Sequence, residues 1–147
     1  MTTRSSHGLR TWIVVLATLA SVAAGQALAQ DPRASTVQKA ARDWYVLFDA
    51  GDIAGSRNAA GAKFRESVDA EAWGQAIART RIPVGDLEQR AMLSTKFDTV
   101  LKDGGPPGDF AVIVFRSSYT KRPETYETIT LEHERDGVWR VIGFENQ

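Results

Sequence analysis

Two stretches near the end of the chain decide the fold: Glu127-Thr128-Ile129-Thr130-Leu131 and Asp136-Gly137-Val138-Trp139-Arg140-Val141-Ile142-Gly143-Phe144. Apolar and polar residues alternate along both stretches, as they do in half-buried β-strands. The dipeptide Asp136-Gly137 between them is typical of a two-residue type I′ turn. The two stretches are therefore predicted to form a β-hairpin with this dipeptide at its tip.

A two-residue turn also fixes the register of the two strands, because it places Arg135 opposite Val138. One face of the hairpin is mainly apolar, with Ile129, Leu131 and His133 opposite Phe144, Ile142 and Arg140. The other face is mixed, with Thr130, Glu132 and Glu134 opposite Gly143, Val141 and Trp139. We predict that the apolar face points to the core and that Trp139 projects from the mixed face.

The rest of the chain reads as helices followed by strands. We expect a first helix with Ser35 as N-cap and Gly51 beyond its end, a second from Ile53 to about Ala60 capped by Asp52, and a third starting at Asp69. Phe64 is either a buried anchor of the second helix or part of a short turn after it. Further strands are expected within 87–101, 110–115 and 126–135, with a Gly/Pro loop at 102–109 and a turn at 119–124. The predicted fold class is α+β, with three N-terminal helices packed on a curved antiparallel sheet of about four strands.

The first 29 residues have the layout of a secretory signal peptide. Arg4, His7 and Arg10 precede an uncharged stretch from Trp12 to Ala24, and Ala27-Leu28-Ala29 forms a small-x-small cleavage site. The uncharged stretch is shorter than the roughly 20 residues of a membrane-spanning helix. We therefore expect cleavage after Ala29, a single domain over residues 30–147, no stable membrane insertion after cleavage, and a periplasmic or secreted location.

Composition excludes several kinds of site. The chain has 147 residues, no cysteine and a formal net charge of zero, so it can form neither disulfides nor thiolate metal sites. Its even charge balance argues against nucleic-acid binding, which needs a basic surface. With 43% hydrophobic residues it can fold around an apolar core without covalent cross-links.

Several short motifs together resemble a known family. They are the end of the first helix, Leu47-Phe48-Asp49-Ala50-Gly51-Asp52, the helix start Asp69-Ala70-Glu71-Ala72-Trp73 with Phe64 before it, and the two hairpin strands. In this order and spacing they resemble the domain of unknown function 4019 family, which comprises secreted bacterial proteins of about this size. The layout is also similar to the cone-shaped fold of nuclear transport factor 2-like proteins, in which three helices close the mouth of a bent sheet. That superfamily includes isomerases, dehydratases, hydrolases and non-catalytic binding modules, so the resemblance implies a fold and no particular activity.

The sequence offers no strong catalytic or metal-binding motif. After signal cleavage His133 is the only histidine, too few for a histidine-based metal site, so we expect neither a metal nor a cofactor. No G-x-S-x-G motif is present. The glycines of 104–108 lie between two strands and are interrupted by Pro106 and Pro107, which lack the N–H groups of a phosphate-binding loop.

A general base inside the cone is the remaining catalytic possibility. The candidate residues are His133, Glu127, Tyr45, Tyr119 and Asp49. An imidazole placed opposite Arg140 would stay neutral, as a general base requires, and the alternative is a partly exposed histidine at the end of a sheet. If one of these residues is a base, the protein is a small isomerase- or hydrolase-type enzyme.

We predict instead a non-catalytic domain that binds a small apolar ligand or another envelope protein. The basis is an aromatic-rich core with no converging set of polar residues. The candidate ligand- or partner-binding residues are Trp139 and Val141 on the mixed hairpin face, together with Arg140, and the mixed face could support a homodimer. A contact-only structural role is a further alternative that the sequence does not separate from binding.

Overall fold

The computed structural model describes residues 31–147, and the predicted signal peptide with its cut after Ala29 lies outside them. Four helices come first: α1 (Ala34–Asp49), α2 (Ile53–Ala59), α3 (Ala62–Ser67) and α4 (Ala70–Arg81). Four strands follow: β1 (Leu87–Asp98), β2 (Phe110–Tyr119), β3 (Arg122–His133) and β4 (Trp139–Asn146). The strands form one antiparallel sheet in the order β1-β2-β3-β4, so each strand pairs with its neighbour in sequence. This arrangement confirms the predicted α+β class.

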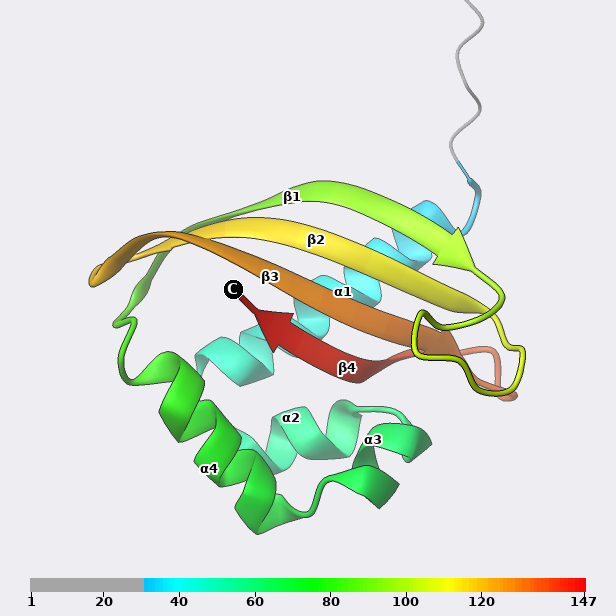
Figure 1. Ribbon diagram of the computed structural model, residues 1–147, viewed down its shortest axis with the longest axis horizontal. Coiled ribbons are helices and arrows are strands. Elements are labelled where there is room, and N and C mark those ends of the chain that lie inside the picture. Colours follow the sequence, from blue (N-terminus) through cyan, green and yellow to red (C-terminus); the bar gives the residue numbers. More distant parts are fainter. Residues whose placement is uncertain (1–30) are drawn as a thin grey trace, which may run out of the picture.

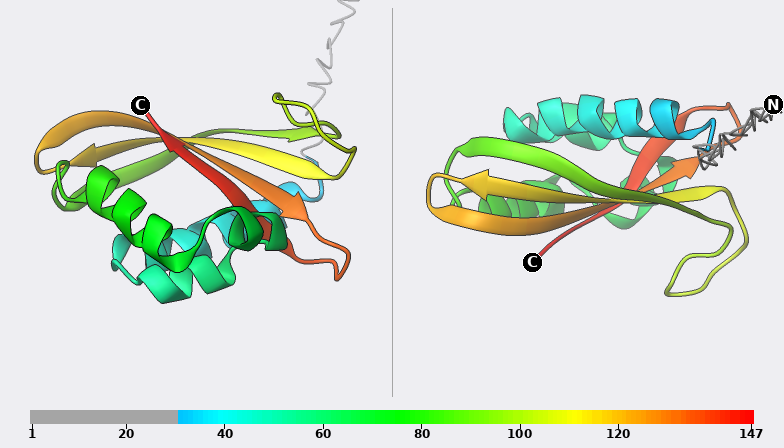
Figure 2. Two further views of the ribbon diagram at one scale, coloured as in Figure 1. Left: turned by 60° about the horizontal axis from the view of Figure 1, so that its bottom comes forward. Right: turned by 90° about the horizontal axis from the view of Figure 1, so that it is seen from above.

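The helices lie together on one side of the curved sheet (Figure 1). The two further views show that α1 runs along the sheet (Figure 2). They also show α2 and α4 beside each other on the same side of the sheet. The core between these layers is rich in aromatic side chains, and Trp44 stacks on Phe48 at a ring-centroid distance of 5.2 Å. The indole N–H groups of Trp44 and Trp73 are both satisfied by buried Ser56, at 2.8 and 2.9 Å.

The helix ends confirm two predicted caps and correct a third. Asp52 and Asp69 each accept a hydrogen bond from the backbone N–H three residues on, at 2.8 Å. Ser35 is not an N-cap, because α1 already begins at Ala34. The turn before it is made by Asp31, whose carbonyl accepts from the N–H of Ala34 at 2.9 Å. Gly51 adopts the expected left-handed conformation after α1, with φ of 70°.

A fourth helix, α3, contains Phe64, which was expected either as a buried anchor of the second helix or in a short turn after it. Its six residues bury Phe64 against Trp73 in an edge-to-face contact of 5.0 Å. The residue before it, Gly61, donates its backbone N–H to the carbonyl of Val141 at 2.7 Å. This segment therefore covers part of the outer edge of β4, while β1 forms the other edge of the sheet.

The hairpin between β3 and β4 exists, but its turn differs from the predicted type. Gly137 has φ of 79°, whereas Asp136 does not adopt positive φ as a type I′ turn would require. The N–H of Glu134 donates to Val138 and the N–H of Gly137 donates to Glu134, which makes a three-residue loop. The Asp136 carboxylate accepts from the N–H of Val138 at 3.1 Å and favours this conformation.

The changed turn shifts the register near the hairpin tip by one residue. His133 pairs with Trp139 and Leu131 with Val141, whereas Ile129 still pairs with Phe144 as predicted. An irregularity after Thr130 absorbs the difference. As a result the predicted faces are wrong at the tip: Trp139 and Val141 point into the core and are 6% and 1% exposed.

The connection between β2 and β3 is also shorter than predicted. β2 continues to Tyr119 and β3 begins at Arg122, so the expected turn at 119–124 shrinks to two residues. The side chains of Ser117, Tyr119, Thr125 and Glu127 consequently lie on paired strands and are buried. Four polar side chains from this end of the sheet thus become part of the interior.

Candidate functional site

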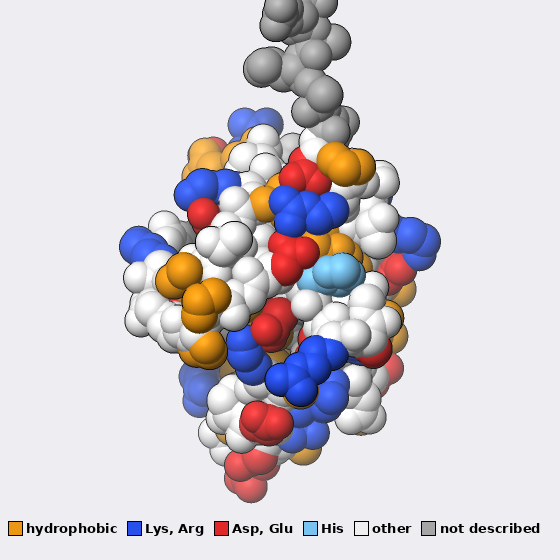
Figure 3. Space-filling model, turned by 90° about the vertical axis from the view of Figure 1, so that its right-hand side faces the viewer, with side chains coloured by type: hydrophobic (Ala, Val, Ile, Leu, Met, Phe, Trp, Pro, Cys, Tyr) orange, Lys and Arg blue, Asp and Glu red, His pale blue; other side chains and the backbone are white. Residues whose placement is uncertain are grey.

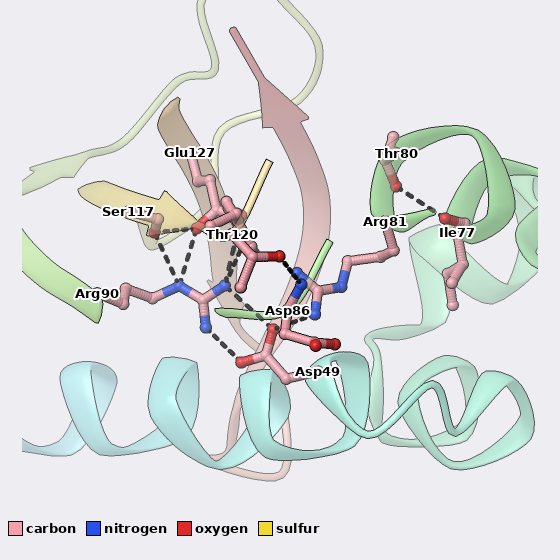
Figure 4. A network of polar contacts seen from close by, with 10 residues as sticks. Asp49, Ile77, Thr80, Arg81, Asp86, Arg90, Ser117, Thr120 and Glu127 are labelled. Carbon is pink, nitrogen blue, oxygen red and sulfur yellow. Dashed lines mark hydrogen bonds and ion pairs between the residues drawn. The ribbon is translucent and has the colours of Figure 1, made fainter. Parts of the chain in front are cut away.

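Arg90 on β1 is the centre of a polar cluster enclosed between the sheet and the end of α1. Its guanidinium donates to Glu127 on β3 at 2.8 Å and to Asp49 on α1 at 2.5 Å. The same group lies 3.7 Å from the centre of the Tyr45 ring, a cation–π contact. Figure 4 shows Arg90 between the two carboxylates, with the Ser117 hydroxyl beside the Glu127 end. Only 9% of the Arg90 side chain is exposed, so this is a buried ion-pair network.

Glu127 is fully occupied by its partners. One carboxylate oxygen accepts from the Ser117 hydroxyl at 2.5 Å as well as from Arg90, and the other accepts from the Tyr119 hydroxyl at 2.5 Å and from a second Arg90 nitrogen at 3.4 Å. Its side chain is 2% exposed. A general base must reach a substrate proton, and these bonds leave Glu127 no free lone pair facing a cavity. Glu127 is therefore an anchor of the network in this structure.

The network and its burial raise the pKa values of Arg90, Tyr119 and Tyr45. Burial works against the charged form of Arg90, but hydrogen bonds to Asp49 and Glu127 outweigh it and raise the pKa of the guanidinium. Burial, followed by the hydrogen bond to Glu127, raises the pKa of Tyr119 to about 12. Burial and the Glu127 charge also raise the pKa of Tyr45. Both phenols are therefore neutral at ordinary pH.

Arg81 at the end of α4 completes the charge balance. One of its guanidinium nitrogens lies 3.7 Å from an Asp49 oxygen, and Figure 4 shows its side chain reaching toward Asp49. The guanidinium also lies over the Tyr119 ring at 4.9 Å. Two arginines and two carboxylates thus neutralise one another inside this cluster.

An open cleft of about 400 Å³ lies beside the network, between α1 and β1. Val46, Met92 and Phe115 contribute apolar surface to it. Tyr45, Asp49 and Arg90 bring one side of the polar network into the wall, and Arg42 completes the lining. Its volume falls within the range of about 300–1,000 Å³ common for small-molecule sites. This cleft is the candidate functional site.

His133 lies at the opposite end of the sheet, away from the cleft. Its ring stacks on Trp139 at 4.9 Å and its Nδ1 is 3.3 Å from an Asp109 carboxylate oxygen. Asp109 also accepts from Arg33, which in turn lies 4.1 Å from the centre of the Phe97 ring. Figure 3 shows the histidine, in pale blue, on the surface among acidic and basic side chains. His133 is not brought together with Tyr45, Tyr119 or Glu127.

The three residues expected to meet a ligand or partner are placed differently from the prediction. Trp139 and Val141 belong to the hydrophobic core, where Trp139 also contacts Phe97 edge-to-face at 5.9 Å. Arg140 does not face His133 but forms ion pairs with Glu134 at 2.6 Å and Asp136 at 2.8 Å. Trp139 and Val141 therefore present little surface to a partner, whereas the Arg140 side chain is 26% exposed and is held by its two ion pairs.

Sequence reasoning found some members of the buried network and missed others. Glu127 shares its strand face with Ile129 and Leu131, so the alternating pattern already placed a carboxylate inside. Arg90 was missed because register shifts near Leu87 and Met92 break the alternation of β1. Arg42, Val46 and Met92 were missed as cleft residues because a groove between a helix and a strand has no local sequence signal.

Two other open clefts of similar volume, about 330 and 420 Å³, lie elsewhere in the described part of the chain. Within residues 31–147 no group of three His, Asp or Glu side chains could hold a metal ion. No helix in that range is long and apolar enough to cross a membrane.

Helices on one side of a four-stranded sheet, with an ion-pair network beside an open cleft, define a small α+β domain with a candidate binding site. The chain belongs to the family described as "Protein of unknown function (DUF4019)", whose profile matches residues 40–144. Neither curated proteins nor solved structures gave a match. The wider resemblance to nuclear transport factor 2-like proteins stays a prediction.

Proposed function

We propose that this protein is a non-catalytic binding domain that holds a small, largely apolar ligand in the cleft between α1 and β1. The observation that carries the proposal is the cleft itself, with exposed Val46 on one wall and Met92 and Phe115 on the other. The polar network beside it gives the cleft a fixed wall, because Arg90 is held by partners from three elements.

The enzyme alternative has less support. Glu127 is saturated by hydrogen bonds, and His133 lies at the other end of the sheet from Tyr45 and Tyr119. A partner-binding role through Trp139 and Val141 also has less support, because both side chains are buried in the core. We therefore propose ligand binding as the function of this protein.

The proposed compartment is the periplasm or the exterior of the cell. The basis is the layout of the first 29 residues, with a positive start, an uncharged stretch and a small-x-small site ending at Ala29. Expressing the precursor in a bacterial host and measuring the native mass of the recovered protein tests this directly. A periplasmic species starting at Gln30 supports the proposal, and a membrane-bound full-length species contradicts it.

The cleft is tested with the fluorescent apolar anion 8-anilinonaphthalene-1-sulfonate. Val46→Trp should narrow the cleft and weaken the probe's binding at least about tenfold, since 1.4 kcal/mol of lost contact has that effect. Val138→Trp is a matched control, because Val138 is also exposed but lies in the β3–β4 loop, away from the cleft. Equal binding to wild type and both variants would show that the probe does not occupy this cleft.

A further inference from the structure

Resting on the proposed function, we propose that the natural ligand of the α1–β1 cleft is a small amphipathic anion whose charged head pairs with Arg42. The head has the chemistry of a carboxylate, and the apolar tail lies along Val46, Met92 and Phe115. The charges that line the cleft and their positions along α1 support this assignment.

Three charged side chains line the cleft, and two of them are already compensated. Asp49 binds Arg90 through both carboxylate oxygens, at 2.5 and 3.1 Å, and also lies near Arg81. Arg90 is further neutralised by Glu127. The network next to the cleft therefore carries no excess charge toward a ligand.

Arg42 is the uncompensated charge of the lining. It is exposed, and no carboxylate of residues 31–147 forms an ion pair with it. The neighbouring acid, Asp43, is engaged by Lys39 at 2.6 Å. A cationic ligand would find Asp49 already shared by two arginines, whereas an anion would find a guanidinium with free donors. The charge of the cleft thus selects an anion.

The spacing along α1 orients this anion. Arg42, Val46 and Asp49 follow one another at intervals of four and three residues, which places them on one face of the helix. Seven residues separate Arg42 from Asp49, a distance of about 10 Å along the axis. The head at Arg42 therefore lies two turns from the polar network, with apolar Val46 between them. A single-headed amphiphile matches this pattern, since its tail then runs over apolar side chains.

Three probes with the same eight-carbon chain separate head-group charge from tail burial: octanoate, octan-1-ol and octylammonium. Their dissociation constants are measured from the changes in amide chemical shifts when each probe is titrated into the purified protein. Wild type should bind octanoate about fivefold more tightly than octan-1-ol, the effect expected of an exposed ion pair, and octylammonium most weakly. Arg42→Gln should abolish the preference for octanoate and leave octan-1-ol binding unchanged. Arg79→Gln, a matched change of an exposed arginine on α4, should keep the preference for octanoate.

The outcomes separate this inference from the function on which it rests. If octanoate and octan-1-ol bind equally, or if Arg42→Gln leaves the preference intact, the cleft is a binding site but the anion assignment is wrong. Tightest binding of octylammonium would also overturn the assignment and transfer the head group to Asp49. If none of the three probes shifts residues of the cleft, the proposed function itself fails.

Discussion

Two clusters of arginine, acid and aromatic side chains occupy opposite ends of the same sheet and differ in burial. In the first, the Arg90 and Glu127 side chains are 9% and 2% exposed. In the second, Arg33 and Asp109 pair in the same way but are 40% and 35% exposed. Water screens the exposed second pair much more than the buried Arg90–Glu127 pair, so removing one partner leaves a bare charge in the interior only at the first. The comparison teaches that the location of such a pair, more than its chemistry, sets its energetic importance.

The largest expected effect is that of Arg90→Met. The change leaves Asp49 and Glu127 without their shared cation, and breaking a buried ion pair costs about 3–5 kcal/mol of the free energy of unfolding. Arg33→Met makes the same substitution at the exposed cluster and should cost less than about 1 kcal/mol. Urea unfolding followed by tryptophan fluorescence measures both. Equal losses would show that burial is not what separates the two clusters.

Trp139→Ala is expected to have the next largest effect, about 3 kcal/mol, because it leaves a cavity in the core. Its stacking partner His133 is at the surface, and His133→Ala should change the free energy of unfolding by less than about 1 kcal/mol. Thermal or urea unfolding of the two variants provides the test. A small loss for Trp139→Ala would contradict the inward orientation of this residue and restore the mixed-face prediction.

Tyr119→Phe removes a hydroxyl that donates to buried Glu127, and we expect a loss of about 1.5–3 kcal/mol at neutral pH. Tyr45→Phe is the matched control, because the buried Tyr45 hydroxyl has no hydrogen-bond partner. Removing it should leave the stability unchanged or slightly higher. Urea unfolding at pH 7 distinguishes the two phenols, and equal losses would contradict the distinct roles assigned to them.

Tyr119→Phe should also change how the stability of the protein depends on alkaline pH. The pKa of Tyr119 is raised from 10 to about 12, so between these values the folded state holds a proton that the unfolded state releases. The stability contributed by this group is complete below pH 10 and is lost as the pH rises toward 12. Urea midpoints of the wild type should therefore fall between about pH 10 and 12. Tyr119→Phe should show a shallower fall, and a parallel one would rule out this titration.

Asp109→Asn is expected to have the smallest effect. Asp109 joins Arg33 and His133 at the exposed cluster, where an ion pair contributes less than about 1 kcal/mol. The difference from wild type in the free energy of unfolding should disappear at about 1 M salt, where the Debye length is roughly 3 Å. Urea unfolding at low and high salt measures it. A large, salt-independent loss would place this cluster in the same energetic class as the Arg90 network.

Much of the fold was predictable because its signals are local. The apolar stripe of α1, the caps Asp52 and Asp69, and the alternation of β3 depend on residues close in the chain. The hairpin tip was harder, because Asp-Gly suits two loop types that both need positive φ at glycine. The Asp136 side chain, bonded to Val138 and Arg140, accompanies the longer loop. That one-residue difference moved Trp139 from the expected outer face into the core.

By itself the sequence determined the α+β class, the order of the main elements and the presence of an acid, Glu127, on the inner face of a strand. These properties follow from periodicity and capping, which act over a few residues. Only the tertiary structure decided that Arg90 and Asp49 would meet Glu127 and that Arg42 would line a cleft with Met92. Asp49 and Arg90 are 41 positions apart in the chain, and the segment between them carries no pattern that specifies this contact. It arises because packing α1 against the sheet brings the two together, and buried charges must find partners.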